Sequence, residues 1–547
     1  MREIRRSRIQ RSLGDERLQR LAGALASLGI AIAMFSRYSL SGTLSRDEGI
    51  YVYGGQQLAH HGTAPYVSIF DPKGPLADML CALGAVLAGP FGLRELTAIR
   101  LLFAALSAGT VVALYLFAQR IFGSVLAGVA AAAVLSSFDC FANDAVQGPD
   151  AKTPAIFCVV LAMWLATHRR WLWVGVLSGL AVLTWQPMFT YPVVFAACAL
   201  LLPEAAGRRV NWQALGRLLL GIAAPLVAVA IYFAADGAFG RLWTAAIVFP
   251  LTGVRRGSTT FASRAAHIQK VIDHHYHGAA LIWIGGILLV AVTAAVFVRN
   301  GREWRAALAD PIVCIAFATG VLQVGYVLVD FQGYPDTLPL LPYPALGIAG
   351  TVALVLHAAR RVPTSRRAAE IAVAGLTAVL VVFAWSWLEH DKLNDHGLHA
   401  ELADACALHL SLGPSQQLLS LGYPPALVLT GRTNPSPYIY LDSGVAVWKA
   451  KHTPGGFSGW LKEIAAGNPG AVVIDGWKSP RRTQVRSFLH EIGYHPVHFG
   501  GWLVFLDDAA RARAKSHDIA LSRQKSAAAH TVDGKMLPGY SCLSANG

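Results

Sequence analysis

About eleven apolar segments, each near the length that crosses a bilayer, dominate this 547-residue chain. A helix needs roughly 20 apolar residues to span the hydrocarbon core of a membrane. Only 14% of the residues are charged, whereas soluble proteins carry about 25%. The sequence therefore predicts an α-helical polytopic membrane protein. The expected spans are residues 20–40, 95–118, 124–138, 152–167, 171–188, 189–203, 218–235, 278–298, 311–330, 337–357 and 370–388.

A further apolar piece, residues 76–91, is short and contains Asp78 and Pro90. If it does not cross and the N-terminus is cytoplasmic, most arginines and lysines fall in short inner loops. If it did cross, every later loop would change sides and this bias would nearly vanish. The positive-inside rule therefore favours eleven spans, with residues 76–91 lying at the outer surface.

Basic charge follows the same topology. The formal net charge is +14, and the positive residues fall in loops between apolar runs, which argues against nucleic-acid binding. Residues 1–19 are rich in arginine and precede the first apolar segment without a convincing cleavage site. We therefore expect a multi-pass protein of the plasma (inner) membrane, with a retained first span and a cytoplasmic N-terminus.

The first outer loop, residues 41–93, concentrates ionisable groups where a helix leaves the membrane. Asp47 and Glu48 are adjacent carboxylates at the start of a short helix expected in the interface plane, over residues 48–59. Ionisable groups at a membrane boundary are usually functional, although a helix N-terminus also favours negative charge for stability alone. Lys73 lies between two prolines that could aim its ammonium at an anion, or it could anchor a lipid headgroup.

Two other polar groups are candidates for substrate contact. Arg100, near the outer end of the second span, could grip a phosphate with two hydrogen bonds or extend to the interface. Asp150, in the second outer loop, could cap the next helix or face the same cavity as Asp47. The cluster Asp273–His277 in the third outer loop has no diagnostic metal spacing. The sequence requires no cofactor and leaves a divalent metal open.

Beyond Trp387 the composition shifts to that of a small extracytoplasmic α/β domain, residues 390–508. The polar tail, residues 509–547, is expected to be disordered. Cys406 and Cys542 could pair outside the cell, but nothing in the sequence requires it. The expected strands are Ala426–Thr430, Ala471–Asp475 and Trp502–Leu506, and the expected helices are Gly459–Ala466 and Arg482–Ile492.

Three motifs in the first outer loop resemble a known family. They are Asp47-Glu48-Gly49-Ile50-Tyr51, then Gly62 with Pro65-Tyr66, then Asp71-x-Lys73-x-Pro75-Leu76. They are similar to the first outer loop of GT-C-fold glycosyltransferases. The similar branch contains the polyprenyl- or dolichyl-phosphate-mannose mannosyltransferases (family 39) and the aminoarabinose transferases.

The resemblance implies a GT-C-like transmembrane catalytic domain over residues 20–389. It also implies that Asp47 is the catalytic carboxylate, Glu48 its neighbour in the same cavity, and Lys73 a ligand of the lipid phosphate. Tyr51 and Tyr66, within the matched motifs, are expected beside the substrate.

The expected function is transfer of a sugar from a polyprenyl-phosphate donor to an acceptor at the outer face of the membrane. A glycosyl phosphate carries its own leaving group, so the reaction needs a base for the acceptor hydroxyl and cations for the phosphate. Asp47 as the single base predicts inversion at the anomeric carbon. The sugar stays open, as does the acceptor, which could be a glycan, a glycolipid or a protein. The alternative is a polytopic transporter or lipid flippase for a glycolipid or anionic substrate, but no inverted repeat is visible.

Overall fold

The computed structural model describes residues 2–201, 211–252, 260–276, 278–360, 363–388, 397–441, 444–474 and 480–517, together with 519, 531–532 and 535–536. The chain divides into two compact units, each built from three separate stretches. Unit 1 comprises Met1–Tyr38, Leu102–Val229 and Thr259–Leu393. Unit 2 comprises Ser39–Leu101, Ala230–Ser258 and Asn394–Gly547. The first outer loop and the C-terminal residues therefore belong to one compact unit.

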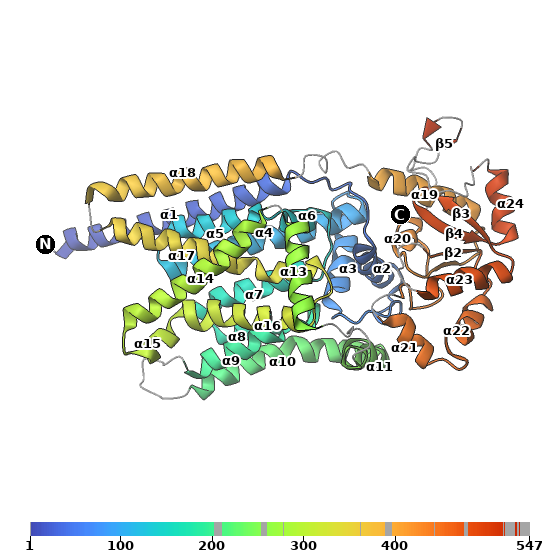
Figure 1. Ribbon diagram of the computed structural model, residues 1–547, viewed down its shortest axis with the longest axis horizontal. Coiled ribbons are helices and arrows are strands. Elements are labelled where there is room, and N and C mark those ends of the chain that lie inside the picture. The colour runs from blue at the N-terminus through green and yellow to red at the C-terminus, as the bar shows by residue number, and fades with distance from the viewer. Residues whose placement is uncertain are drawn as a thin grey trace. The chain divides into compact units, whose positions relative to one another are not determined.

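Helices long and apolar enough to cross a membrane confirm the predicted polytopic architecture (Figure 1). Within the described ranges there are seven, or up to eight if α5 (Val125–Ser137) and α6 (Asp139–Gln147), which meet at 72°, form one broken span. Three other expected spans are shorter apolar helices, namely α7 (Lys152–Thr167), α8 (Trp171–Thr184) and the joined η1 and α9 (Gln186–Leu201). The seven long spans are Glu16–Phe35 of α1 (Arg2–Phe35), α4 (Glu95–Phe122), α10 (Trp212–Ala235), α14 (Ala279–Asn300), η3 with α16 (Ile312–Val329), η4 with α17 (Tyr334–Ala359), and Arg366–Trp387 of α18 (Pro363–Trp387).

Small residues let the helices of unit 1 approach one another closely. α14 and α17 pack along each other, and a Cβ atom placed on Gly347 would lie 1.9 Å from the carbonyl oxygen of Gly285. Helices in lipid associate through van der Waals packing, which small residues at the contact improve. Any larger side chain at position 347 would push these two helices apart.

A mixed four-stranded sheet forms the core of the C-terminal part of unit 2 (Figure 1). Its order is β1 (Leu418–Ser420), β2 (Ala471–Val473), β4 (Trp502–Leu506) and β3 (His495–Phe499). β1 and β2 run parallel, and the other two pairs are antiparallel. Every residue of β1, β2 and β4 is buried. The surrounding helices are α19 (Gly397–Ser411), α20 (Pro425–Thr430), α21 (Val445–Lys451), α22 (Gly456–Ala465), α23 (Pro480–Glu491) and α24 (Asp508–Ser516).

The predicted strands at 471–475 and 502–506 and the predicted helices at 459–466 and 482–492 correspond to β2, β4, α22 and α23. Asp475, the last residue of the first predicted strand, lies outside the described residues. The predicted strand Ala426–Thr430 is wrong, because these residues form α20. Proline at the first helical position and glycine just past the last one are typical helix boundaries. Pro425 begins α20, and Gly431, with a φ of 63°, ends it by donating to carbonyls of the last turn.

Residues 509–516, expected to belong to a disordered tail, form most of α24. The side chain of Asp507 accepts a hydrogen bond from the backbone N–H of Ala510, which caps this helix. Ala510 and Ala514 are buried, so α24 has one face against the rest of unit 2. Cys542 lies outside the described residues, and Cys406 is buried in α19.

Two helices form the first outer loop. α2 (Arg46–His61) contains the predicted helix 48–59, and α3 (Leu76–Ala88) occupies the apolar piece 76–91. α3 has 13 residues, and its length of about 20 Å is too short to cross a membrane. α2 packs against both α3 and α20. The third outer loop, residues 236–276, is divided between the units. Its first part forms α11 (Phe239–Trp243), η2 (Thr244–Val248) and α12 (Phe249–Leu251) in unit 2, and its second part forms α13 (Phe261–His275) in unit 1. The short helix α15 (Trp304–Ala309), later in the chain, also belongs to unit 1.

Candidate active site in the first outer loop

The two adjacent carboxylates at the start of α2 have different surroundings. The Glu48 side chain accepts a hydrogen bond from the backbone N–H of Ser45 at 3.1 Å, and the Ser45 hydroxyl accepts one from the N–H of Glu48 at 3.3 Å. This reciprocal arrangement is a capping box, which satisfies two backbone donors at the helix start. Asp47 forms an ion pair with Arg46 at 3.4 Å, and its side chain is 47% exposed against 16% for Glu48. Asp47 is therefore the more accessible base.

Arg100 fastens the segment that leads into α2. Its side chain is fully buried and donates to the carbonyls of Leu40 at 2.6 Å, Gly42 at 3.0 Å and Thr43 at 3.2 Å. It also lies 3.5 Å from the Glu48 carboxylate. Because the guanidinium is buried and bonded to this segment, its contacts favour a positioning role. They favour neither extension to the lipid interface nor a grip on phosphate.

Glu401 of α19 holds the same segment from the C-terminal part of unit 2. Its carboxylate accepts hydrogen bonds from the N–H of Leu44 at 2.8 Å and from the hydroxyl of Tyr423 at 2.9 Å. Burial raises the pKa of Glu401 to about 7, opposed by these hydrogen bonds and by the charge of Arg100. Burial likewise raises the pKa of Glu48 to about 7, with Arg100 acting in the opposite direction. Near neutral pH these two carboxyls therefore change charge readily.

Lys73 is fixed by two tyrosines and an aspartate. Its ammonium contacts the Tyr51 hydroxyl and lies 4.8 Å from the centre of the Tyr51 ring. Its backbone N–H donates to the Asp71 carboxylate at 3.1 Å, and its carbonyl accepts from the Tyr66 hydroxyl at 2.5 Å. Tyr66 has a φ of 67°, a left-handed conformation that costs about 1–2 kcal/mol for a residue with a side chain. Such an outlier persists only where its surroundings enforce it.

Buried carboxyls surround the Lys73 turn. Asp71 and Asp78 are 2% and 1% exposed. Burial and the charge of Asp71 raise the pKa of Asp78, whereas Lys73 lowers it. The contact that fixes this turn is the hydrogen bond from the backbone N–H of Lys73 to the Asp71 carboxylate. The sequence showed Asp78 only as an obstacle to membrane crossing, but a carboxyl in an apolar helix is also a signal of a buried polar site.

C-terminal residues complete the first outer loop. A Cβ atom on Gly49 would meet the ring of Pro425 at 2.7 Å, so α2 and α20 approach closely only because position 49 is glycine. The Tyr53 hydroxyl accepts a hydrogen bond from the N–H of Asn434 at 2.8 Å. The N–H of Phe70 donates to the carbonyl of Pro437 at 2.7 Å. These contacts could not be predicted from the sequence, because their partners lie more than 350 residues apart.

Six of the seven predicted site residues lie in unit 2, and Asp150 lies in unit 1. Asp150 accepts a hydrogen bond from the backbone N–H of Lys152 at 2.7 Å, as expected for a carboxylate near a helix start. The Lys152 ammonium lies 3.8 Å from Asp150 and 3.8 Å from Asp336, and all three residues are buried. The predicted sharing of a cavity between Asp150 and Asp47 stays a prediction.

The described residues contain no group of three or more histidine, cysteine, aspartate or glutamate side chains that could hold a metal ion. In the histidine cluster of the third outer loop, the His274 and His275 rings meet edge to face, and His275 stacks on Tyr334. His277 lies outside the described residues.

The chain matches no protein-family model and no curated protein. It is similar in structure to ArnT from Cupriavidus metallidurans in the apo state, with a TM-score of 0.59, 16% identity, and coverage of 91% of this chain and 99% of that one. The same enzyme bound to undecaprenyl phosphate gives a TM-score of 0.54, 17% identity, and coverage of 90% and 98%. An Archaeoglobus fulgidus oligosaccharyltransferase, tethered to an acceptor peptide, gives a TM-score of 0.50 and 15% identity. That match covers 83% of this chain and 68% of the oligosaccharyltransferase. Because both enzymes have the GT-C fold, this chain has the GT-C fold, as its first outer loop predicted.

Proposed function

We propose that this chain is a membrane glycosyltransferase that moves a sugar from a polyprenyl-phosphate donor to an acceptor. One observation carries the proposal: the first outer loop, in unit 2, holds both an accessible carboxylate, Asp47, and an ammonium fixed by its neighbours, Lys73. The GT-C fold supports it, since a structurally similar ArnT has been seen with undecaprenyl phosphate. The reaction takes place at the outer face of the inner membrane, following the charge distribution of the loops.

The proposed reaction is a single displacement. The acceptor hydroxyl oxygen attacks the anomeric carbon, and the bond between that carbon and the donor phosphate oxygen breaks. The hydroxyl proton passes to the Asp47 carboxylate, and polyprenyl phosphate leaves with the electron pair. Lys73 stabilises the negative charge that develops on the phosphate. Because one displacement inverts the anomeric carbon, the product has the opposite anomeric configuration to the donor.

The remaining residues of the site act by positioning. Tyr51, Tyr66 and Asp71 fix the ammonium and backbone of Lys73. Glu48 and Arg100 fix the start of α2, which carries Asp47. Mannose, arabinose and aminoarabinose donors all fit this scheme, as do glycan, glycolipid and protein acceptors.

The test is transfer of radiolabel from synthetic polyprenyl-phosphate sugars by the purified, full-length protein in detergent. Asp47→Asn should lower the rate by about 10²–10⁴-fold, because it removes the general base. Asp508→Asn, at an aspartate whose side chain is 90% exposed on α24, is the matched control. Unchanged turnover in Asp47→Asn would contradict the assignment. In proteoliposomes, movement of labelled donor across the bilayer without transfer would favour the flippase alternative.

A further inference from the structure

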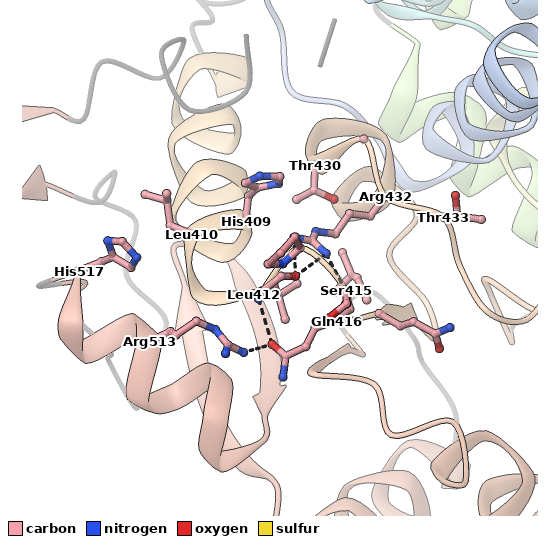
Figure 2. Close-up of a pocket in the computed structure, with 15 residues that line it drawn as sticks. His409, Leu410, Leu412, Ser415, Gln416, Thr430, Arg432, Thr433, Arg513 and His517 are labelled. Atoms are coloured by element: carbon pink, nitrogen blue, oxygen red, sulfur yellow. Dashed lines mark hydrogen bonds between the residues drawn. The ribbon is translucent and has the colours of Figure 1, made fainter. Parts of the chain in front are cut away.

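A cavity of about 650 Å³ lies in unit 2, and none of the residues assigned above lines it (Figure 2). It is bounded by the end of α19, the loop that leads into β1, the turn after α20, and α24. Among the residues that the structure describes, its lining includes two arginines and two histidines, together with serine, threonine and glutamine side chains, but no aspartate or glutamate. The charged and titratable lining residues are His409, Arg432, Arg513 and His517.

Both arginines lack a carboxylate partner among the described residues. Arg432 donates to the carbonyl of Gln416 at 2.6 Å and to that of Gly413 at 3.4 Å. Arg513 donates to the carbonyl of Ser411 at 3.2 Å and to the side-chain oxygen of Gln416. All of these acceptors are uncharged, so they orient the guanidiniums without neutralising them.

The two positive charges also act on each other. Burial, and then the charge of Arg513, lowers the pKa of Arg432. The Nε of Arg432 is buried and has no hydrogen-bond partner in the part of the chain that the structure describes. Like charges brought together at a cavity wall are unfavourable unless an anion binds between them.

A nearby carboxylate, Asp507, has other partners. It caps α24 by accepting from the N–H of Ala510 at 2.6 Å. Its other oxygen accepts from the side-chain N–H of Gln416 at 3.0 Å. Gln416 therefore links Asp507 to Arg513, because its amide N–H donates to Asp507 and its amide oxygen accepts from Arg513. Figure 2 shows the contact between Gln416 and Arg513.

We propose that this cavity is a binding site for an anionic saccharide, with Arg432 and Arg513 holding the phosphate or carboxylate group. Arginine is suited to both groups because its planar donors match their oxygens. The volume exceeds what a bare phosphate needs and falls within the range of small-ligand sites. Ser415, Gln417 and Thr433, whose side chains carry hydroxyl and amide groups, also line the cavity. The anion site follows from the contacts alone. The inference that the bound saccharide is the acceptor of the transfer reaction rests on the proposed function.

The experiment measures binding to the full-length protein in detergent by calorimetry, with glucose 6-phosphate, galacturonate, glucose and inorganic phosphate as probes. The two anionic sugars should bind and glucose should not. Arg513→Gln should weaken the binding of both by roughly tenfold or more, because it removes a charge-assisted contact. Arg513→Lys, which keeps the charge, should weaken it less. Arg511→Gln, on the same helix but outside the lining, is the matched control and should bind like the unaltered protein.

Several results would overturn the site. Equal binding of glucose and glucose 6-phosphate would show that charge is not recognised. Equal losses in Arg511→Gln and Arg513→Gln would indicate a diffuse charge effect. Displacement of glucose 6-phosphate by undecaprenyl phosphate would assign the anion to the lipid donor instead. If inorganic phosphate binds as tightly as both anionic sugars, the cavity recognises only the anion, and the saccharide part of the proposal is wrong. Asp47→Asn should bind all probes normally, so a failure of the transfer reaction is distinguishable from a failure of this site.

Discussion

The contacts of Arg100 lead to a prediction that separates a positioning role from phosphate binding. Replacing Arg100 with glutamine removes a buried cation that holds three carbonyls and approaches Glu48 at 3.5 Å. Hydrogen bonds to a charged group contribute about 1.5–3 kcal/mol each, and removing one partner of a buried ion pair costs about 3–5 kcal/mol. These contributions overlap, so we expect a loss of about 4 kcal/mol in the free energy of unfolding.

The assay is thermal unfolding of the detergent-solubilised protein, combined with transfer kinetics. A loss of about 4 kcal/mol corresponds to a fall of roughly 10 °C in Tm for a unit of this size. Arg94→Gln, at an exposed arginine six residues earlier, should leave Tm within about 1 °C. In transfer assays run well below the new Tm, the Arg100→Gln protein should keep the KM for its polyprenyl-phosphate donor within a few fold.

The opposite pattern would refute the positioning role. If Arg100→Gln unfolds at the same temperature as the unaltered protein but its donor KM rises by a factor of ten or more, the guanidinium contacts substrate phosphate. Arg100→Lys gives a second measurement. If Arg100 acts by positioning, the lysine ammonium, which reaches only one carbonyl, should recover only part of the lost stability. If Arg100 binds the donor phosphate, lysine should keep the donor KM close to that of the unaltered protein.

Three further predictions concern the contacts that build unit 2. Gly49→Val should lower Tm by the equivalent of about 1–3 kcal/mol, since its Cβ would meet Pro425 at 2.7 Å, whereas Gly89→Val, with open space around it, should cost less than half as much. Because the pKa of Glu401 rises from 4.5 to about 7 on folding, its contribution to the free energy of unfolding is greatest below pH 4.5 and falls by up to about 3 kcal/mol as the pH rises through 7. Glu401→Gln should therefore flatten the dependence of Tm on pH between about 5 and 8, and an unchanged slope would refute the assignment. Asp507→Ala should destabilise unit 2 by about 1 kcal/mol through loss of the α24 cap, measured by urea unfolding, and no change in midpoint would show that the cap is dispensable.

The helices were predicted well because apolar length and helical periodicity can be read from neighbouring residues in the sequence. Apolar length marked the spans, and the faces of residues 48–59 marked α2. The prediction of a strand at Ala426–Thr430 was wrong because it gave more weight to the run of apolar residues than to the helix-boundary signals, the proline before the run and the glycine after it. Strands β1 and β3 were missed because three residues of β1 carry no periodicity, and His495–Phe499 alternates polar with apolar side chains only weakly.

The candidate site was predictable in its residue types but not in its contacts. Asp47 and Lys73 stood out as ionisable groups in an apolar chain. The partners of Arg100 could not be inferred, because they are backbone carbonyls, which every residue has. Glu401 was missed because acidic residues in an alanine-rich helix are also typical of an ordinary exposed helix. The cavity lined by Arg432 and Arg513 joins residues 81 positions apart, whose proximity only the fold creates.

The assembly of unit 2 from three separate stretches bears on how the protein is made. Leu44, Gly49 and Tyr53 emerge from the ribosome early, yet their partners Glu401, Pro425 and Asn434 are synthesised last. Contacts so distant in sequence form late and slow the folding of a chain. The loop that carries Asp47 and Lys73 therefore waits for nearly the whole polypeptide before it reaches its final conformation. A nascent chain truncated before residue 397 should insert its membrane spans but lack the contacts that complete the site. The protein should therefore have no transferase activity until these later residues have been synthesised.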